Sequence, residues 1–236
     1  MLALTQGMMS LGAAGGSGFN AYVATLSPLA WWRLDSSAAS GNPMGDSSGN
    51  GYNGTLNSGA YSSGITGGAG LAGGRAGIAG SATNAALILG GSASGAWSVS
   101  MFVDVPSTGS PNDYAIDRGS NEFAIIYGFV GGTFEVFSPG ASNNPRPSSA
   151  MAVSGTGLHH VVYTYDNGTF RGYLNGTQVF STTISFSLPS SGSAWTIGAS
   201  GANSNLYDGA IYDVQLYSRA LSASEVSGMW GQRDTP

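Results

Sequence analysis

Two Asn-Gly pairs that lie eight residues apart, Asn167-Gly168 and Asn175-Gly176, constrain the fold of this chain more than any other feature. Asn-Gly is the strongest short signal for a two-residue hairpin turn, because both central residues of that turn need a positive φ. Segments rich in β-branched and aromatic residues surround the pairs, at 158–165, 169–174 and 177–181. The spacing equals one short strand plus its turn, so it predicts a three-stranded antiparallel meander.

Both pairs are followed by Thr, as is Asn53-Gly54, so all three also match the acceptor pattern for N-linked glycans. Glycosylation would require export. The N-terminal stretch "MLALTQGMMSLGAAGGSGF" has no basic residue before Arg33, and Gln6 interrupts its apolar part, unlike a signal peptide. It is also too short and too rich in glycine for a membrane span. We therefore interpret the motifs as turns, in a chain made in the cytoplasm without a signal peptide.

Short apolar segments separated by Gly, Pro or Asn continue through the rest of the chain, a pattern typical of an all-β sandwich or barrel. The further predicted strands are 29–34, 85–89, 96–105, 122–130, 133–137, 194–199 and 206–217. Residues 35–82 consist mostly of Gly, Ser, Ala and Asn, which predicts long loops with at most one strand, near Tyr52–Leu56. The sandwich is expected to span about 21–230 as one domain.

A single helix is predicted near the C-terminus, in "LSASEVSGMW". Ser222 is a suitable N-cap and Glu225, three residues later, completes a capping box. Val226, Met229 and Trp230 then fall on one face of the helix, which predicts that this face packs on the sandwich.

The composition excludes several classes of function. A formal net charge of −5 disfavours nucleic-acid binding, which needs a basic surface for the phosphates. The absence of cysteine excludes disulfides, a thiolate nucleophile and cysteine-ligated zinc. Only 8% of the residues are charged, but 42% are hydrophobic and 11% aromatic, which is enough to build a core.

Three stretches, in the expected order, together resemble the laminin-G-like, concanavalin A-like jelly-roll superfamily. They are "SPLAWWRLD" with "DSSGNGYNGT" (27–55), "LHHVVYTYDNGTFRGYLNG" (158–176) and "YDGAIYDVQLYSRALSASEV" (207–226). The resemblance implies a two-sheet antiparallel jelly-roll sandwich with one short C-terminal helix. Leu158 stands where the family usually has Trp, Asn175 replaces an Asp, and Tyr212 occupies a position that is often acidic. The loss of acids near the loops counts against a family-type calcium site.

Residues 1–20 form an apolar, glycine-rich arm in front of the predicted domain, 21–236. The apolar side chains of the arm are Leu2, Leu4, Met8, Met9 and Leu11. An uncharged apolar segment of this kind usually marks a protein contact, so we expect the arm to dock on a partner. The opening "YVATLSPLAWWRL" after such an arm resembles versions of the fold found in bacteriophage virion proteins.

That resemblance implies a non-enzymatic virion component, either a head decoration or a tail protein. The arm would bind other virion proteins, the chain would form a homo-oligomer, and the lectin-like domain would contact glycans of the host surface. Membrane insertion is not expected. The first alternative is a free-standing bacterial carbohydrate-binding module, and the second is a glycoside hydrolase.

The acidic residues do not form the pattern of a glycosidase, although some relatives of this fold are glucanases. Retaining enzymes need two carboxyl groups about 5–5.5 Å apart. The glutamates Glu122, Glu135 and Glu225 are isolated from one another in the sequence. A group of aspartates is predicted to lie in a loop that contains two prolines: Asp104, Asp113 and Asp117. We predict no catalytic residue.

The histidines and two of the aspartates raise the question of a metal site. His159 and His160 are adjacent, so on a strand they point to opposite faces and cannot share a metal ion. His160 is expected to be a core residue that bonds to a neighbouring backbone group. Calcium is the only cofactor left open, with Asp46 and Asp208 as candidate ligands. The alternative for Asp46 is that its carboxylate bonds the backbone of its own turn.

Aromatic residues in loops are candidates for a sugar-binding platform, which needs a ring face open to solvent. The candidates are Tyr52, Tyr61, Tyr114 and Tyr207. The tryptophans lie on predicted strands or on the helix, and we expect most of them in the core.

Overall fold

The computed structural model describes residues 18–34, 45–63, 69–78, 95–105, 113–119, 123–128, 131–137, 151–184, 195–200 and 205–233, with the backbone alone for 55–63 and 69–78. Residues 2–11 of the predicted arm, the predicted strand 85–89 and Glu122 lie outside this part of the chain.

The described chain consists of strands with a helix near each end. The elements are, in order, α1 (Gly18–Thr25), β1 (Ala30–Trp32), β2 (Thr55–Ser63), β3 (Ala69–Ile78), β4 (Trp97–Val105), β5 (Asp113–Arg118), β6 (Phe123–Tyr127), β7 (Phe134–Phe137), β8 (Gly157–Asp166), β9 (Thr169–Leu174), β10 (Thr177–Thr183), β11 (Trp195–Ile197), β12 (Ala210–Tyr217) and α3 (Ala223–Gln232). None of the helices in the described residues is long and apolar enough to cross a membrane.

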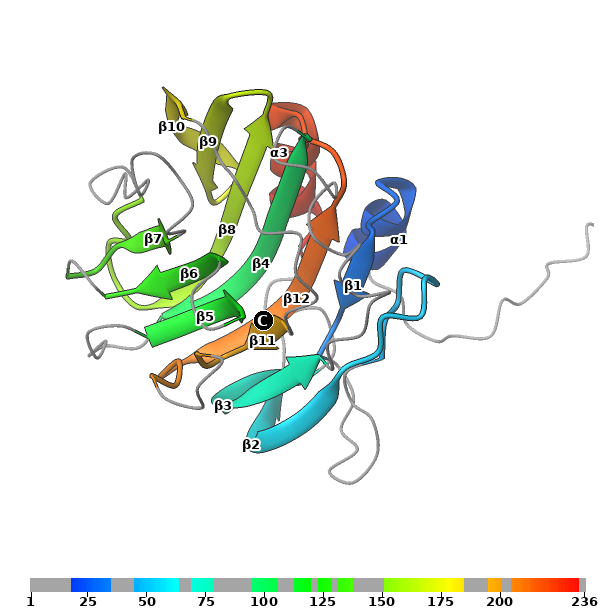
Figure 1. The fold of residues 1–236 in the computed structure, drawn as a ribbon, viewed down its shortest axis with the longest axis vertical. Helices are drawn as coiled ribbons and strands as arrows, with labels where there is room; N and C mark the ends of the chain where they lie inside the picture. The colour runs from blue at the N-terminus through cyan, green and yellow to red at the C-terminus, as the bar shows by residue number, and fades with distance from the viewer. Residues whose placement is uncertain are drawn as a thin grey trace, which may run out of the picture.

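The strands form one antiparallel hydrogen-bonded path, β10-β9-β8-β4-β12-β3-β11-β5-β6-β7, with β1 added to β12 and β2 to β3. Strand β12 is the corner of this path, because its first residues pair with β3 and its later residues pair with β1. The path folds into two layers, with β5, β6, β7 and β11 in front of β4, β8 and β12 (Figure 1). The predicted two-sheet antiparallel jelly-roll sandwich is confirmed.

The main core lies between the two layers and is rich in aromatic side chains. Trp97 of β4 packs edge-on against Phe123 of β6, with 5.5 Å between ring centroids. Phe123 in turn contacts Trp195 of β11 at 6.0 Å. Aromatic pairs at such distances add about 0.5–1.5 kcal/mol each to the free energy gained by burying their area. This core joins the front and back layers into one domain.

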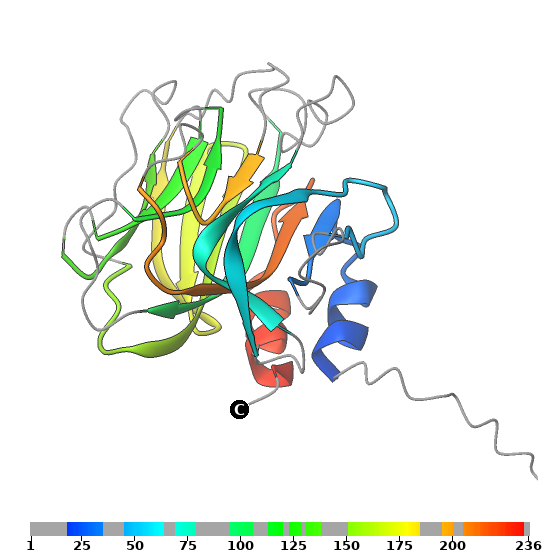
Figure 2. The same ribbon diagram turned by 90° about the horizontal axis from the view of Figure 1, so that it is seen from below.

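A second core lies on the outer face of the back layer, where α1 and α3 lie side by side (Figure 2). Phe19 of α1 meets Phe102 of β4 edge-on at 5.2 Å, and Val226 and Met229 of α3 are fully buried. The expected packing of α3 is confirmed, together with its capping box. Helix α1 was not predicted, and it takes Phe19 and Asn20 of the expected arm into the folded body.

The two helices run antiparallel and approach closely because glycine lies at their contacts. A Cβ atom on Gly228 would lie 2.1 Å from the hydroxyl oxygen of Tyr22. At the far end, a Cβ atom on Gly18 would lie 2.9 Å from Oε1 of Gln232. Any larger residue at position 228 must therefore displace the side chain of Tyr22.

The two Asn-Gly turns lie where the sequence predicts them. The backbone φ is 44° at Asn167 and 95° at Gly168, and it is 51° at Asn175 and 79° at Gly176. Positive φ at both central residues is the condition for the predicted hairpin turns, and β8, β9 and β10 form the expected meander. Asn53-Gly54 is different: it has no positive φ, and the Asn53 side chain accepts the backbone N–H of Asp46 at 2.9 Å.

Two segments predicted as loops are strands. Within 35–82, β2 and β3 pair with each other over their whole lengths, from Thr55 opposite Gly77 to Ser63 opposite Ala69. Asp113–Arg118, expected in a proline-containing loop, forms β5 between β6 and β11. In both cases pairing with neighbouring strands outweighs a weak local preference for strand.

Candidate functional site

Strand β1 pairs with β12 on one side only, and a turn formed by residues 45–50 takes the place of a strand on its other side. The carboxylate of Asp46 accepts the backbone N–H of Trp31 at 2.9 Å, and the Ser47 N–H donates to the Trp31 carbonyl at 2.7 Å. Asn50 Nδ2 donates to the Leu29 carbonyl at 2.9 Å. The turn thus satisfies backbone groups that an edge strand otherwise exposes.

The carboxylate of Asp46 is fully engaged in this turn. Besides Trp31 N–H, it accepts the Ser48 N–H at 2.9 Å, the Ser48 hydroxyl at 2.8 Å and the Tyr52 N–H at 3.0 Å. The geometry therefore agrees with the turn-bonding alternative for Asp46. Asp208 lies before β12, where its N–H contacts Asp113 at 3.4 Å.

The structure does not bring the two predicted calcium ligands together. Asp46 bridges to Trp32, whose partner on β12 is Val214, whereas Asp208 precedes the first residue of that strand. Asp46 therefore lies beside the middle of β12, and Asp208 lies before its first residue. No group of three or more His, Asp, Glu or Cys side chains in the described part of the chain could hold a metal ion.

A pocket of about 360 Å³ lies between the 45–50 turn, the end of α1 and the residue after β12. Its volume is within the range of small-ligand sites, about 300–1,000 Å³. The lining residues are Ala24, Ser27, Pro28, Leu29, Trp31, Ser47, Ser48, Asn50 and Ser218. The walls thus combine hydroxyl and amide groups with the apolar surface of Trp31, Pro28 and Leu29.

Three hydroxyl groups in this pocket are free to bind a ligand. Ser27, Ser47 and Ser218 are exposed, and their side chains make no hydrogen bond within the part of the chain that the structure describes. A serine hydroxyl can donate one hydrogen bond and accept two, and it rotates to suit its partner. The pocket is therefore suited to a ligand that itself carries several hydroxyl groups.

Trp31 forms a fixed apolar wall of the pocket. Its indole N–H donates to Oδ1 of the buried Asp213 at 3.1 Å, and the guanidinium of Arg33 lies 5.9 Å from its ring centre. Only 5% of Trp31 is exposed, so the ring presents no open face to solvent. Asp213 has a φ of 45°, inside the irregular register where β12 passes β4.

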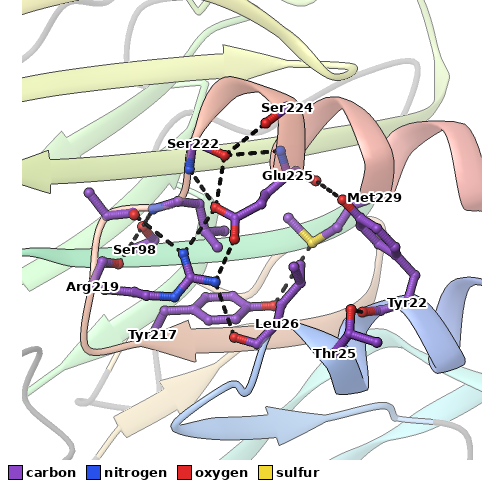
Figure 3. Close-up of polar contacts among 12 residues, drawn as sticks. Tyr22, Thr25, Leu26, Ser98, Tyr217, Arg219, Ser222, Ser224, Glu225 and Met229 are labelled. Atoms are coloured by element: carbon purple, nitrogen blue, oxygen red, sulfur yellow. Dashed lines mark hydrogen bonds and ion pairs between the residues drawn. The ribbon is translucent and has the colours of Figure 1, made fainter.

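A polar network holds the α1 side of the pocket on the sandwich (Figure 3). Arg219, which follows Ser218, donates to the carbonyl of Leu26 at 3.2 Å and forms a two-point ion pair with Glu225. The hydrogen bonds from Arg219 and from Ser222 lower the pKa of Glu225 to about 2. The end of α1 is thus fixed to the start of α3, which holds this side of the pocket in place.

The predicted tyrosine platforms are largely closed to solvent. Only 1% of Tyr207 is exposed, and its hydroxyl donates to the Asp104 carbonyl at 3.2 Å inside the main core. Tyr114 is 9% exposed and packs with Ala124 and Ile126 on β6, so neither ring presents an open face. Tyr52 is half-buried beside the Asp46 turn. The side chain of Tyr61, on β2, lies outside the described atoms.

The pocket combines residues that the sequence does not show to be neighbours. Trp31 was expected in the core, and the serines gave no signal of their own. One signal was present: "DSSGNG" is a turn motif beside the strand that contains Trp31. Only the pairing of β1 with β12 brings Ser218 to this turn.

The acidic side chains Asp117 and Glu135 share one face of the front layer, which the sequence did not predict. Asp117 pairs with Ala124, and Glu135 pairs with Ile126 on the same strand. Their backbones lie two strands and two residues apart, roughly 12 Å. Both side chains are buried.

His160 is a core residue, as predicted, but its partner is a side chain rather than the backbone. One ring nitrogen, Nε2, lies 2.9 Å from the hydroxyl of Ser100. The ring is stacked on Phe102 at 4.3 Å, and it lies parallel to Trp230 at 6.5 Å. Burial lowers the pKa of His160 to about 3, so the ring is neutral at ordinary pH.

Several solved structures have a similar fold. Domain 4 of AbnA, a GH43 extracellular arabinanase from Geobacillus stearothermophilus solved with arabinotriose, is 22% identical with a TM-score of 0.64, over 86% of this chain and 98% of that domain. The binding domain of Paraclostridial Mosquitocidal Protein 1 is 15% identical with a TM-score of 0.60, over 84% of this chain and 51% of that chain.

Trypanosoma rangeli sialidase in complex with 2,3-difluorosialic acid is 14% identical with a TM-score of 0.59, over 87% of this chain and 33% of the sialidase. At these identities the similarities show the fold alone. No curated protein sequence matches the chain.

A sequence profile gives the family. The profile described as the concanavalin A-like lectin/glucanases superfamily matches residues 79–227, which is more than half of the chain. The matched region runs from before β4 to the first turns of α3, and so includes most strands of both layers. This chain therefore belongs to the concanavalin A-like lectin/glucanases superfamily.

Proposed function

We propose that this chain is a non-enzymatic, carbohydrate-binding component of a bacteriophage particle, and that the pocket beside β1 binds a glycan of the host surface. The observation that carries the proposal is the set of three hydroxyls, on Ser27, Ser47 and Ser218, that have no hydrogen-bond partner among the described residues and line one pocket together with Trp31. Sugars are bound by such a combination, because their hydroxyls need hydrogen-bond partners while their C–H groups pack on apolar surface.

The state of the carboxylates supports a binding role rather than a hydrolytic one. A glycosidase needs a pair of carboxyl groups that reach the substrate. In the described residues, Asp117 and Glu135 are buried, and the carboxylate of Asp46 is occupied by its turn. Glu225 is held by Arg219 and serves the capping box.

The particle assignment rests on the N-terminal arm and on the composition. Leu2, Leu4, Met8, Met9 and Leu11 form an apolar segment without charge, as expected of a docking element. The low proportion of charged residues, 8%, fits a protein that packs against neighbours. In this proposal the arm binds other virion proteins or further copies of the chain, and the sandwich faces outward.

A free-standing carbohydrate-binding module is the second candidate. Its support is the similarity to domain 4 of the arabinanase, which this chain covers over 98% of its length and which was solved with arabinotriose. The pocket has the same role in both proposals. They differ only in whether the chain is attached to a particle.

A pair of variants on one helix tests the pocket. Ala24 lines the pocket and Ala21 does not, yet both are exposed positions of α1. Ala24→Phe should fill the pocket and abolish binding on a glycan array and in calorimetry, whereas Ala21→Phe should bind like the wild type. Binding that both variants retain would place the ligand elsewhere. Release of reducing sugar that is lost in Asp117→Asn or Glu135→Gln would overturn the non-enzymatic role.

Purification of particles separates the two candidates. A virion component co-purifies with phage particles through density gradients at a fixed ratio to the major coat protein. A free-standing module binds the same glycan but is absent from particles.

A further inference from the structure

We infer that the pocket beside β1 selects uncharged sugar units and rejects anionic ones such as sialic and uronic acids. This inference rests on the proposed carbohydrate-binding function and specifies its ligand class. It is carried by the charges in and around the pocket.

Among the described residues that line the pocket, none has an ionisable side chain. Its polar groups are the serine hydroxyls and the amide of Asn50, and the remainder is apolar. A carboxylate that leaves water must pair with a cation or accept several strong hydrogen bonds. Otherwise the free energy of losing its hydration exceeds the free energy gained from its contacts. Serine hydroxyls can donate to a carboxylate, but they bring no positive charge to offset its loss of hydration.

Two arginines that adjoin described residues of the lining, Arg219 and Arg33, already have partners. The guanidinium of Arg219, next to Ser218, forms a two-point ion pair with Glu225 and also donates to the Leu26 carbonyl. The guanidinium of Arg33 lies against the ring of Trp31. Arg33 itself is not among the residues that line the pocket. An anionic ligand would have to break an existing interaction to gain a cation.

A carboxylate in the wall of the pocket adds to this preference. Asp46 lies within the turn that forms one wall, and its neighbours Ser47 and Ser48 line the pocket. Each of its oxygens accepts two hydrogen bonds, which keeps the carboxylate in place close to the ligand site. The formal net charge of −5 repels anions from the whole molecule as well.

The apolar arm is a poorer occupant of this pocket than a sugar. Three free hydroxyls would be buried without partners beneath leucine and methionine side chains, and each buried unsatisfied hydroxyl is unfavourable. A ligand with several hydroxyls of its own satisfies all three.

The test uses the full-length chain on a printed array in which neutral oligosaccharides stand beside their sialylated, sulfated or uronic-acid-containing derivatives. For each oligosaccharide that binds on the array, calorimetry then measures the Kd of the neutral parent and of its anionic derivative. The derivatives should bind at least about tenfold more weakly than their neutral parents, because they must desolvate an unpaired anion. Ala24→Phe should remove both signals.

A charge variant makes the test specific to the pocket. Ser218→Lys places a cation in the lining, and it should reduce the preference for the neutral member of each pair by about tenfold. Ala21→Lys adds the same charge on exposed α1 outside the pocket and should leave the preference unchanged.

The outcomes separate the inference from the function on which it rests. Anionic derivatives that bind as tightly as their parents, with a signal that Ala24→Phe removes, would overturn the inference and leave the binding function standing. If the chain binds no oligosaccharide on the array, the proposed function is overturned, and the inference with it. Binding that Ala24→Phe leaves intact would also overturn the inference.

Discussion

Arg219 and Glu225 meet through two parallel contacts, 2.7 Å between Nη2 and Oε1 and 3.0 Å between Nη1 and Oε2. Glu225 also accepts the backbone N–H of Ser222 at 2.7 Å, so one carboxylate both caps α3 and holds the arginine that binds the Leu26 carbonyl. The attachment of α1 therefore depends on a residue of α3.

Glu225 should make the protein sensitive to acid. Its pKa is lowered from 4.5 to about 2, so the folded state favours the ionised form. This stabilisation is present above pH 4.5 and is lost as the pH falls towards 2. Because Arg219 is 42% exposed, solvent screens the pair, and we expect Glu225→Gln to lower the free energy of unfolding by roughly 1 kcal/mol at pH 7.

Denaturant titrations at pH 7 and pH 3 measure this effect. Glu225→Gln should differ less from the wild type at pH 3 than at pH 7. Asp208→Asn removes an exposed carboxylate and is the matched control. An equal difference at both pH values would show that the ion pair contributes nothing to the pH dependence.

His160 should lower stability at mildly acidic pH. Burial lowers its pKa from 6.5 to about 3. Between these two pH values the ring is therefore protonated in the unfolded chain and neutral in the folded chain. The stability is complete above pH 6.5 and decreases as the pH falls towards 3. Between pH 6.5 and 4.5 this single group accounts for about 2 kcal/mol.

His160→Gln removes the titrating ring and keeps a polar partner for Ser100. We expect the variant to be less stable at pH 7 but to have a flatter pH profile between 6.5 and 4.5. The measurement is the free energy of unfolding in urea at each pH. Profiles that run parallel in variant and wild type would argue against a neutral, buried His160.

Two glycines in similar turns should differ in their sensitivity to substitution. Gly168 and Gly176 both have positive φ, so Val at either site strains the backbone by about 1–3 kcal/mol. A Cβ atom at position 176 would also lie 2.9 Å from Cβ of Trp230, whereas at position 168 the nearest atom is 4.0 Å away. Gly176→Val should therefore be more destabilising than Gly168→Val.

The contact with Trp230 can be separated from the backbone strain. In a Trp230→Gly background, which removes the Cβ of residue 230 as well as its ring, the two valine variants should cost the same in thermal or urea unfolding. If Gly176→Val has no effect on stability in either background, the turn assignment fails.

Deletions at two points should separate docking from folding. Removal of residues 1–17 leaves α1 intact, and we expect a change in Tm of less than about 4 °C with loss of incorporation into particles or oligomers. Removal of residues 1–25 also takes away Phe19 and Val23, which are fully buried. Losing two buried apolar side chains costs several kcal/mol, about 10 °C or more.

Calorimetry and light scattering measure both deletions. A truncated 18–236 chain that fails to fold would show that the arm belongs to the sandwich. A truncated chain that still assembles would place the docking surface on the sandwich itself.

The sequence was informative where local chemistry determines the structure. Asn175-Gly176 specifies a turn because few other pairs accept its backbone, and Ser222 with Glu225 specifies a helix start. Strand β3 gave no such signal. Its sequence "AGLAGGRAGI" has little preference for a strand, and it is extended because β2, β11 and β12 pair with it.

The pocket was not predictable for a related reason. Ala24, Trp31, Ser47 and Ser218 become neighbours only after β1 has paired with β12 and α1 has packed on α3. Tyr207 shows the opposite error. Its position beside a glycine-rich segment predicts an exposed ring. In the structure, the Tyr207 hydroxyl donates to the Asp104 carbonyl and the ring contacts Tyr127, so the side chain lies in the core.

The antiparallel packing of the two helices has a consequence for how this domain can be joined to other proteins. Gly18 starts α1 beside Gln232, the last residue of α3, so the described domain begins and ends at one place on its surface. A domain whose two ends lie close together can be inserted into a surface loop of a host protein, because the two residues of the loop that it joins can stay close together. The same proximity allows circular permutation, in which a short linker joins the two helices and new ends are cut at the tip of the β8–β9 hairpin.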